Sequence, residues 1–171
     1  MASLELQSQR LLLRQWTQED ARFLYQLNLD PQVLEYTGDG AFDSIRDAQI
    51  FIENYAQYRL HGFGRWLMVR QDDGAKLGWC GLRRAENRLE VDLGFRLAQE
   101  YWGQGYASEA AQACLSYGHQ VLGIPEIIAR THRSNLRSQH VLERIGMHFE
   151  GECAFDTAPG YWYRSTYQVK R

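Results

Sequence analysis

A strand, a glycine-containing loop and a helix follow one another in the middle of the chain, and this order constrains the fold more than any other feature. Residues 88–97 (RLEVDLGFRL) place Leu89, Val91 and Leu93 on one face and polar residues or glycine on the other, an alternation that predicts a strand. Residues 101–112 (YWGQGYASEAAQ) then set two glycines directly before a helix-forming run. The segment therefore predicts a strand that leads through a glycine turn into a helix.

The start of this helix is a predicted anion-binding site. The first N–H groups of a helix have no partner within it, and the helix dipole favours negative charge at that end. Glycines at positions 103 and 105 let a bulky group approach the main chain. We therefore expect a phosphorylated ligand that binds largely to the backbone.

Two common phosphate-binding motifs do not describe this loop. A dinucleotide-binding fingerprint needs a third glycine three residues after the second, and that position is Ser108. A P-loop needs Gly-Lys-Ser or Gly-Lys-Thr, whereas Gly105 is followed by Tyr106 and Ala107. The glycine loop at residues 103–105 must therefore belong to another type of phosphate-binding motif.

The loop resembles motif A of the GNAT N-acetyltransferases, whose pattern is Gln/Arg-x-x-Gly-x-Gly/Ala. Residues 100–105 (EYWGQG) match at both glycines and depart at the first position, Glu100. The longer string YWGQGYASEA is similar to the ribosomal-protein N-terminal acetyltransferase-like branch. Residues 134–151 (SNLRSQHVLERIGMHFEG) resemble a second block of that branch, with Met147 where phenylalanine is usual. The order of elements agrees with the family from about residue 8 to residue 170.

The resemblance implies one GNAT acetyltransferase domain over residues 1–171, of the α/β (α+β) class. Its mixed, largely antiparallel sheet would have about six to seven strands flanked by helices, and the chain length suits one such domain. Local patterns predict strands at 4–15, 65–71, 76–84, 88–97, 126–132, 147–155 and 161–170. They predict helices at 17–29, 44–60, 107–122 and 135–145, with the loops at 36–43 and 156–160 the least ordered.

Composition and spacing argue against several other classes of protein. A net charge of −2 does not suit nucleic-acid binding through bulk charge. No stretch is long and apolar enough for a membrane span, and a signal segment is not visible at the N-terminus. Three widely spaced cysteines (Cys80, Cys114 and Cys153) indicate reduced thiols and a cytoplasmic protein. The five histidines lack metal-ligand spacing, so no metal is expected.

Acetyl transfer to an amine requires the amine to lose a proton, which suggests a general base. Asp92 lies on the polar face of the predicted strand, two residues before Gly94. It also occupies the acidic position of the family segment, and we take it as the first candidate, acting directly or through a water. Glu90 is the second candidate. The alternative is that both are surface carboxylates on a half-exposed strand.

The second block suggests a group that assists the leaving thiolate. The resemblance implies that Asn135 contacts the pantetheine arm of coenzyme A and that Ser138 lies near its sulfur. Many GNAT proteins use a tyrosine seven residues after the asparagine, and that position is Leu142 here. Ser138 is then the remaining candidate for a hydrogen-bond donor to the thiolate, unless it is simply a serine of a helix N-terminal turn.

The resemblance also implies which residues hold acetyl-CoA, the expected cosubstrate. They come from the strand edge, the glycine loop and the second block: Phe95, Arg96, Leu97, Trp102, Gly103, Gln104, Gly105, Tyr106, Ala107, Asn135 and Ser138. Arginines near the second block are either a solvated surface or contacts to the phosphates of coenzyme A: Arg130, Arg133, Arg137 and Arg144.

The expected activity is acetyl-CoA-dependent transfer of an acetyl group directly to a primary amine, without an acyl-enzyme. A protein N-terminal amine is the first acceptor to consider. A small-molecule amine or aminoglycoside acetyltransferase and a non-catalytic acyl-CoA-binding sensor stay open as alternatives. The expected partners are acetyl-CoA and the acceptor amine, with neither nucleic acid nor membrane, and a homodimer is open.

Overall fold

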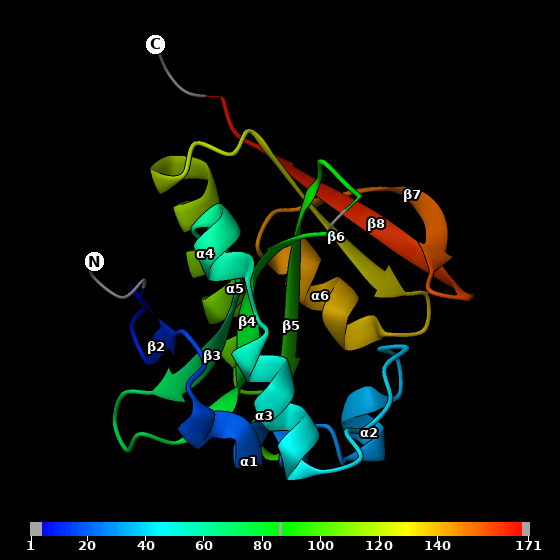
Figure 1. The fold of residues 1–171 in the computed structure, drawn as a ribbon. Helices are drawn as coiled ribbons and strands as arrows, with labels where there is room; N and C mark the ends of the chain where they lie inside the picture. The colour runs from blue at the N-terminus through cyan, green and yellow to red at the C-terminus, as the bar shows by residue number, and fades with distance from the viewer. Residues whose placement is uncertain (1–4, 86, 169–171) are drawn as a thin grey trace.

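One mixed sheet forms the centre of the fold in the computed structural model, which describes residues 5–85 and 87–168 (Figure 1). Its strands are β1 (Leu6–Gln7), β2 (Leu11–Arg14), β3 (Arg65–Arg70), β4 (Lys76–Arg84), β5 (Val91–Leu97), β6 (Glu126–His132), β7 (His148–Phe155) and β8 (Ala158–Thr166). Across the described residues the eight strands run in the order β1-β2-β3-β4-β5-β6-β8-β7. All neighbours are antiparallel except β5 and β6. This confirms the predicted mixed, largely antiparallel sheet, with more strands than the six to seven expected.

Helices cover both faces of the sheet. They are α1 (Ala21–Leu27), α2 (Pro31–Leu34), α3 (Ile45–Glu53), α4 (Gln57–His61), α5 (Tyr106–Ser116) and α6 (Leu136–Arg144). On one face, called the α5 face, Ala110 and Cys114 of α5 pack with Leu82 and Leu93 of the sheet. On the other, called the α3 face, Ile52 of α3 packs with side chains of α1 and β3. Figure 1 shows α3 and α4 on the near side of the sheet. No helix in the described ranges combines the length and apolar character of a membrane span.

The N-terminal strand predicted over residues 4–15 is in fact a hairpin of β1 and β2, and residue 4 lies outside the described residues. Ser8 N–H donates to the carbonyl of Leu11 at 2.9 Å and closes the turn. Ser8 and Arg10 both bind the carboxylate of Glu109 in α5. These long-range hydrogen bonds explain why the predicted strand is interrupted between β1 and β2. No local sequence pattern predicts the interruption.

The predicted helix at 17–29 begins where expected but is shorter. The Asp20 carboxylate accepts a hydrogen bond from Thr17 N–H at 2.8 Å, as the capping box requires. The first turn, Gln18–Asp20, is a 3₁₀ turn, and α1 ends at Leu27. Asp20 is fully buried and binds Arg14 at 2.8 Å and Lys76 at 2.7 Å. Burial opposes its ionisation, but these bonds outweigh burial and lower the pKa of Asp20.

The continuous helix predicted over residues 44–60 is wrong. Ser44 caps α3 by accepting a hydrogen bond from Asp47 N–H at 3.1 Å, but α3 ends at Glu53 and α4 starts at Gln57. Within this break the Tyr55 hydroxyl accepts a hydrogen bond from Arg65 N–H at 2.7 Å. Contact with the sheet therefore outweighs the local preference for one longer helix. Helix α2 was not predicted, although Asp30 and Pro31 form a usual helix start.

The helix predicted at 107–122 and the strand predicted at 161–170 also have different boundaries in the structure. The helix predicted at 107–122 begins one residue earlier, at Tyr106, and its last turn widens into a π-helix over Tyr117–Val121. Strand β8 starts at Ala158 and ends at Thr166, so part of the loop expected at 156–160 is strand. The predicted end of that strand, at 169–170, lies outside the described residues. Strand β6 spans the residues predicted for it.

The strand predicted over residues 88–97 is wrong at its start. Strand β5 begins at Val91, because its pairing with β4 ends where Val91 faces Arg84. Leu89 is 91 % exposed and lies in the hairpin loop rather than on the buried face. Val91 and Leu93 are buried as expected. Glu90 is also exposed in this loop, so it does not share a strand face with Asp92.

Candidate functional site

Strands β5 and β6 pair over two positions and then separate. Val91 faces Ile127 and Asp92 faces Ile128, while residues 93–97 pair with β4 alone. Among the described residues no strand therefore pairs with the other edge of β5 beyond Asp92. That edge offers free main-chain N–H and C=O groups, as an unpaired strand edge does. The open edge includes Phe95, Arg96 and Leu97, the residues expected at the strand edge.

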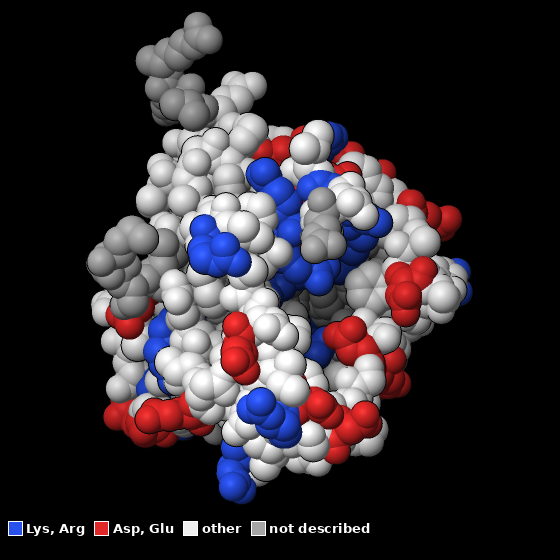
Figure 2. Space-filling view, viewed as in Figure 1, with Lys and Arg blue, Asp and Glu red and all other residues white. Residues whose placement is uncertain are grey.

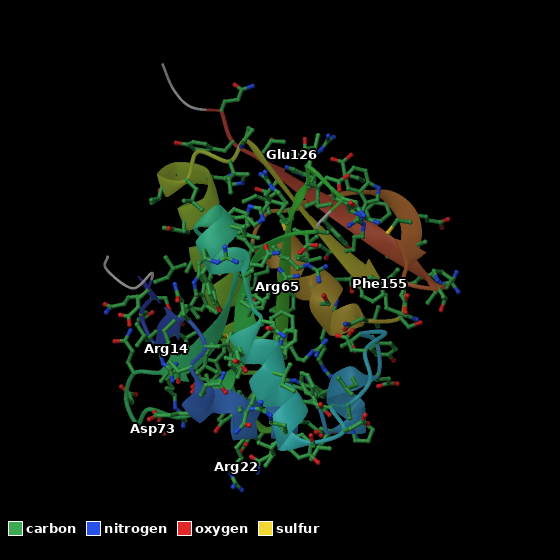
Figure 3. The ribbon with its side chains drawn as sticks, in the orientation of Figure 1. Arg14, Arg22, Arg65, Asp73, Glu126 and Phe155 are labelled. Atoms are coloured by element: carbon green, nitrogen blue, oxygen red, sulfur yellow. The ribbon has the colours of Figure 1, made fainter. Side chains whose placement is uncertain are left out.

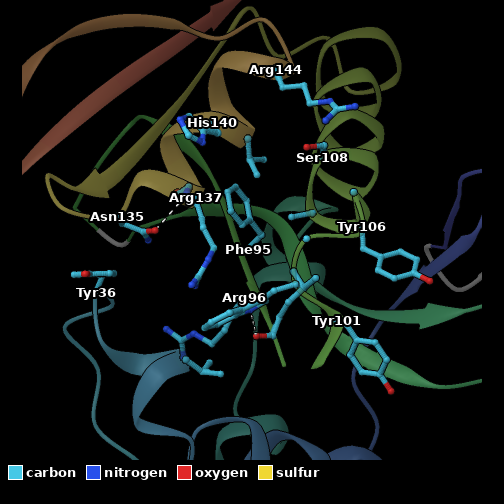
Figure 4. Close-up of a pocket in the computed structure, with 18 of the residues that line it drawn as sticks. Tyr36, Phe95, Arg96, Tyr101, Tyr106, Ser108, Asn135, Arg137, His140 and Arg144 are labelled. Atoms are coloured by element: carbon cyan, nitrogen blue, oxygen red, sulfur yellow. Dashed lines mark hydrogen bonds between the residues drawn. The ribbon is translucent and has the colours of Figure 1, made fainter. Parts of the chain in front are cut away.

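A cavity of about 350 Å³ lies at this open edge. Figure 4 shows side chains of β5, the glycine loop, α5, α6 and the segment after α2 around it. The predicted residues that line it are Phe95, Arg96, Leu97, Trp102, Gly103, Gly105, Tyr106, Ala107, Asn135 and Ser138. Gln104 is exposed and its side chain donates to the carbonyl of Glu100 at 3.1 Å. The loop, the strand edge and α6 thus meet at one place.

The two glycines of the loop adopt the left-handed conformation that favours glycine. Gly103 has φ +74° and Gly105, the N-cap of α5, has φ +83°. A Cβ atom at Gly103 would meet no other atom within 4 Å, so one side of the loop is open. The first helical bond of α5 runs from Glu109 N–H to the carbonyl of Gly105 at 3.1 Å. The N–H groups of residues 106–108 precede it and are available to an anion.

Arg10 fixes the loop from outside the lined cavity, a contact that sequence reasoning missed. Its Nη1 donates to the carbonyl of Gln104 at 3.0 Å, and its Nε binds Glu109 at 2.7 Å. Its guanidinium also lies over the ring of Tyr106, 4.2 Å from the centroid. Burial opposes ionisation of Glu109, but bonds from Ser8 and Arg10 outweigh it and lower the pKa of Glu109. The Glu109 carboxylate, near the start of α5, is therefore paired with Arg10 and is not a free negative charge beside the cavity.

Helix α6 forms the opposite wall. Asn135 caps it, and the Asn135 side-chain oxygen accepts a hydrogen bond from Ser138 N–H at 3.2 Å. The Ser138 hydroxyl has no hydrogen-bond partner in the described part of the chain. Leu142 is buried in the α5-face core, so the position often held by tyrosine is structural here. Asn135 and Ser138 therefore both lie at the cavity, as predicted. The N-cap hydrogen bond between them also accounts in part for their three-residue spacing.

Two of the four arginines near the second block lie at the cavity, and the other two do not. Arg137 and Arg144 line the cavity, whereas Arg130 and Arg133 do not. The Arg137 guanidinium lies over the Trp102 ring, 3.8 Å from its centroid, and so connects α6 with the glycine loop. Figure 4 shows Arg137 projecting from α6 toward the middle of the cavity. Sequence reasoning had left all four arginines open between solvent and ligand.

Other lining residues were not predicted from sequence. They are Gln32, Val33, Tyr36, Thr37, Tyr101, Ser108, His140 and Val141. The first four belong to α2 and the turn after it, about 60 residues before β5. No sequence motif marks that segment. The one available signal was the start of α2, where Asp30 is the N-cap and Pro31 follows it.

The structure places Asp92 on the α3 face, in two ion pairs. Its carboxylate binds Arg65 at 2.7 Å and Arg83 at 3.3 Å, and the side chain is 15 % exposed. Burial opposes ionisation, but the two guanidinium charges outweigh it and hold the pKa of Asp92 below its ordinary value. Asp92 does not line the cavity. Its role as a base stays a prediction, and the ion pairs argue against it, because a base works best with a pKa near the operating pH.

The side chain of Arg96 leaves β5 toward the same α3 face. It is 9 % exposed, and it binds Asp39 at 2.6 Å and the Asn28 side-chain oxygen at 2.9 Å. The ring of Trp79 lies between two guanidinium groups, 5.1 Å from Arg96 and 5.4 Å from Arg65. Figure 3 shows Arg65 in the middle of this face. The α3 face therefore carries a row of arginines beside the cavity.

The arrangement suits a long ligand with amide groups and phosphates. The strand edge can bind amides, and the start of α5 can bind an anion. A cluster of three or more histidine, cysteine or acidic side chains suited to a metal is absent from the described residues.

Comparisons with known proteins agree with this geometry. A model described as "Acetyltransferase (GNAT) domain" matches residues 10–148. The chain is 33 % identical to the uncharacterized protein YkkB of Bacillus subtilis (strain 168), over 86 % of this chain and 87 % of the relative. It is 25 % identical to the spermidine N(1)-acetyltransferase of Escherichia coli (strain K12), over 92 % of this chain and 83 % of that one.

Solved structures show the same fold. A GNAT-family acetyltransferase from Bacillus anthracis superposes with a TM-score of 0.82 at 25 % identity, covering 95 % of this chain and 98 % of that one. The ribosomal L7/L12 α-N-protein acetyltransferase RimL, solved with coenzyme A, has a TM-score of 0.78 at 18 % identity, covering 95 % and 98 %. The chain belongs to the GNAT family of acetyltransferases, and it is an N-acetyltransferase that uses acetyl-CoA.

Proposed function

We propose that the enzyme transfers the acetyl group directly to a primary amine, and that a protein N-terminal amine is its first acceptor. The observation that carries the proposal is the cavity at the open edge of β5, whose lining contains no aspartate or glutamate in the described part of the chain. An N-terminal α-amine has a pKa near 8, so roughly one in ten is neutral at pH 7, against about one in 2,500 for lysine. A site without a carboxylate base favours the acceptor that loses its proton more readily.

In this proposal acetyl-CoA lies along the cavity. The amides of its pantetheine arm pair with the main chain of residues 95–97, and its pyrophosphate binds the loop at 103–107. The left-handed glycines and the free N–H groups at the start of α5 support the second contact. Asn135 contacts the arm from the opposite wall. This arrangement leaves the α3-face side of the cavity for the acceptor.

The transfer joins the amine nitrogen to the acetyl carbon and breaks the bond between that carbon and sulfur. The ammonium gives up one proton to solvent before attack, and the nitrogen gives up a second after attack, which balances the proton that the leaving thiolate takes up. We propose that the Ser138 hydroxyl donates a hydrogen bond to the thiolate. Asp92 as a base is tested by its pH profile, and Glu90 ranks below it because it lies in the exposed hairpin loop.

Direct transfer is supported by the positions of the thiols. Cys80 and Cys114 are fully buried on the α5 face, and Cys153 lies on β7. No cysteine lines the cavity among the described residues. Burial also raises the pKa of the Cys114 thiol well above its ordinary value, which makes it a poor nucleophile.

A small-molecule amine is the second candidate acceptor. The likeness to a spermidine acetyltransferase over most of both chains favours it. The cavity lining opposes a polycation, because in residues 5–85 and 87–168 it includes Arg96, Arg137 and Arg144 but no aspartate or glutamate. An aminoglycoside meets the same difficulty.

A thiol-release screen against N-terminal peptides, polyamines and aminoglycosides tests the proposal. We expect acetyl-CoA-dependent release with peptides and little with polycations. Initial rates measured while both substrates are varied should give intersecting double-reciprocal lines, as direct transfer requires. Turnover with polyamines alone, or the parallel lines of an acyl-enzyme route, would contradict it.

The extent of the domain, the assembly and the location are further proposals. We propose a single domain over residues 1–171 from the family pattern and a cytoplasmic enzyme from the three widely spaced cysteines, and we leave open whether it is a homodimer. Sedimentation equilibrium measures the mass of the assembly directly.

A further inference from the structure

Arg96 is a buried cation with unused hydrogen-bonding capacity beside the cavity. A guanidinium has five N–H donors, and two nitrogens of Arg96 donate to Asn28 and Asp39. Its Nε is buried and has no partner among the described residues. Leaving a buried donor unpaired is unfavourable. A ligand oxygen at this position would satisfy it.

The surroundings of Arg96 are basic. Asp92, Gly94 and Arg96 alternate onto the α3 face of β5, and Arg83 lies opposite Asp92 in β4. The Arg65 guanidinium lies so close to Gly94 that a Cβ atom there would be 2.7 Å from Arg65 Nη2. Figure 2 shows basic side chains gathered beside a hollow in the middle of this face.

The charges in this row do not cancel. Arg65, Arg83 and Arg96 contribute three positive charges, against the two carboxylates of Asp92 and Asp39 that bind them. Asp39 is 60 % exposed and belongs to a turn that contains glycine at 38 and 40. An acceptor carboxylate can therefore bind Arg96 next to Asp39 or replace it.

The direction of the Arg96 side chain separates this anion from the cofactor. Its neighbours Phe95 and Leu97 pack on the α5-face core, so Arg96 points to the opposite face. The glycine loop leads into α5, on the other side of the strand. The phosphates proposed at that loop are accordingly not the anion that Arg96 meets.

We infer that the acceptor is an acidic N-terminal peptide, and that Arg96 determines this specificity by binding a carboxylate close to the reacting amine. The inference rests on the proposed function and names the acceptor class for the same site. Arg65 adds positive potential but is committed to Asp92 and to main-chain carbonyls. Among the described residues, Arg96 is the arginine of the row that lines the cavity and has a buried N–H without a partner.

The test compares two peptides that differ in charge and hardly in shape, Ser-Asp-Ala and Ser-Asn-Ala, both with free N-termini. Calorimetry measures their binding to the protein saturated with coenzyme A, and thiol release measures transfer from acetyl-CoA. The variants are Arg96→Gln, Asp39→Asn and the control Arg133→Gln, an exposed arginine that does not line the cavity.

We expect the unaltered protein to bind the aspartate peptide at least tenfold more tightly than the asparagine peptide. Arg96→Gln should reduce this ratio to below threefold with acetyl-CoA affinity within twofold, and Arg133→Gln should leave the ratio unchanged. Asp39→Asn removes a competing carboxylate at an exposed position, so it should tighten the aspartate peptide about threefold. Asp39→Asn therefore still tests the role of Arg96 in peptide binding if the Arg96→Gln variant does not fold.

Equal affinity for the two peptides in the unaltered protein would overturn the inference. So would an Arg96→Gln variant that weakens both peptides equally, or one that loses acetyl-CoA affinity, because Arg96 would then be structural or a cofactor contact. Failure of the proposed function looks different: the aspartate peptide would bind preferentially, but no thiol would be released.

Discussion

The two walls of the cavity are built in different ways. The part proposed for acetyl-CoA, called the cofactor wall, consists mainly of backbone: an open strand edge, two left-handed glycines and the first turn of α5. The part proposed for the acceptor, together with the α3-face ion pairs beside it, is called the acceptor wall; it consists of side chains from elements far apart in sequence, with Arg96 held by Asn28 and Asp39 near the ring of Trp79. Backbone sites need glycines at fixed spacing, so they leave a motif. Side-chain sites assembled from distant segments leave none.

The difference also predicts how the walls respond to substitution. Changes on the acceptor wall break buried ion pairs and should alter stability and acceptor choice. Changes on the cofactor wall alter main-chain access and should affect acetyl-CoA binding while the protein stays folded. The four variants below separate these outcomes.

The largest effect is expected for Asp92→Asn, which leaves the mostly buried Arg65 and the exposed Arg83 without their carboxylate. Breaking such a pair costs about 3 kcal/mol of unfolding free energy at pH 7. The folded pKa of Asp92 lies below its unfolded value, so its contribution is complete above the unfolded pKa, about 3.9, and is lost as pH falls through the folded pKa. Urea unfolding from pH 7 to pH 3 should show the gap between variant and unaltered protein closing at the acid end.

The same variant tests Asp92 as the base. If Asp92 only holds Arg65 and Arg83, kcat for an N-terminal peptide should keep the shape of its pH profile between pH 6 and 9. The pKa of Asp92 lies below this pH range, so its loss as a base would appear as a rate reduction of about 10²–10⁴ across the whole range, and that result in a folded variant would restore Asp92 as the base.

On the cofactor wall, Gly103→Asp should weaken acetyl-CoA binding at least tenfold, about 1.4 kcal/mol. The matched control is Gly103→Asn, because asparagine has nearly the same shape and both residues tolerate positive φ better than most. A Cβ atom meets no neighbour at this position, so both variants should fold. Calorimetry that gives the same dissociation constant for Asp and Asn would show that no phosphate lies near Gly103.

The two walls differ in how far the sequence could predict them. The strand-loop-helix segment predicted the cofactor wall because its signals are local: alternation, glycine spacing and a helix start. It failed at Leu89 and Glu90, where the β4–β5 hairpin ends pairing earlier than the pattern suggests. Asp92 was placed on the correct strand, but the pattern could not reveal Arg65, 27 residues away, as its partner.

Long-range contacts explain the remaining misses. Arg10 binds Gln104 and Glu109 across more than 90 residues, and no spacing rule connects them. The break between α3 and α4 depends on the contact between Tyr55 and Arg65. Sequence patterns report local preference and amphipathicity, whereas these features depend on which elements meet in the folded chain.

A smaller effect is expected for Ser138→Ala. A free thiol has a pKa near 8.5, so the thiolate is already a fair leaving group and needs little help. Loss of one hydrogen bond, about 0.5–1.5 kcal/mol, should lower kcat roughly three- to tenfold. Steady-state kinetics and calorimetry together decide the role: an unchanged kcat with lost coenzyme A affinity would make Ser138 a binding residue.

The smallest effect is expected for Arg10→Met, which keeps much of the packing on Tyr106 but removes the bonds to Gln104 and Glu109. The loop would then be less ordered before binding, and acetyl-CoA affinity should fall about two- to fivefold, or roughly 0.4–1 kcal/mol. Arg133→Gln serves as the control on an exposed arginine. An unchanged affinity would mean that the loop holds its shape without Arg10.

The most direct test of the account is residue-resolved amide hydrogen exchange with and without acetyl-CoA. Backbone recognition predicts slower exchange at those amides of residues 93–97 that face the open edge and at residues 103–108. Amides of α3 and α4, which lie on the other face, should change little. Protection confined to α3 and α4, with the strand edge and the glycine loop unchanged, would contradict the account.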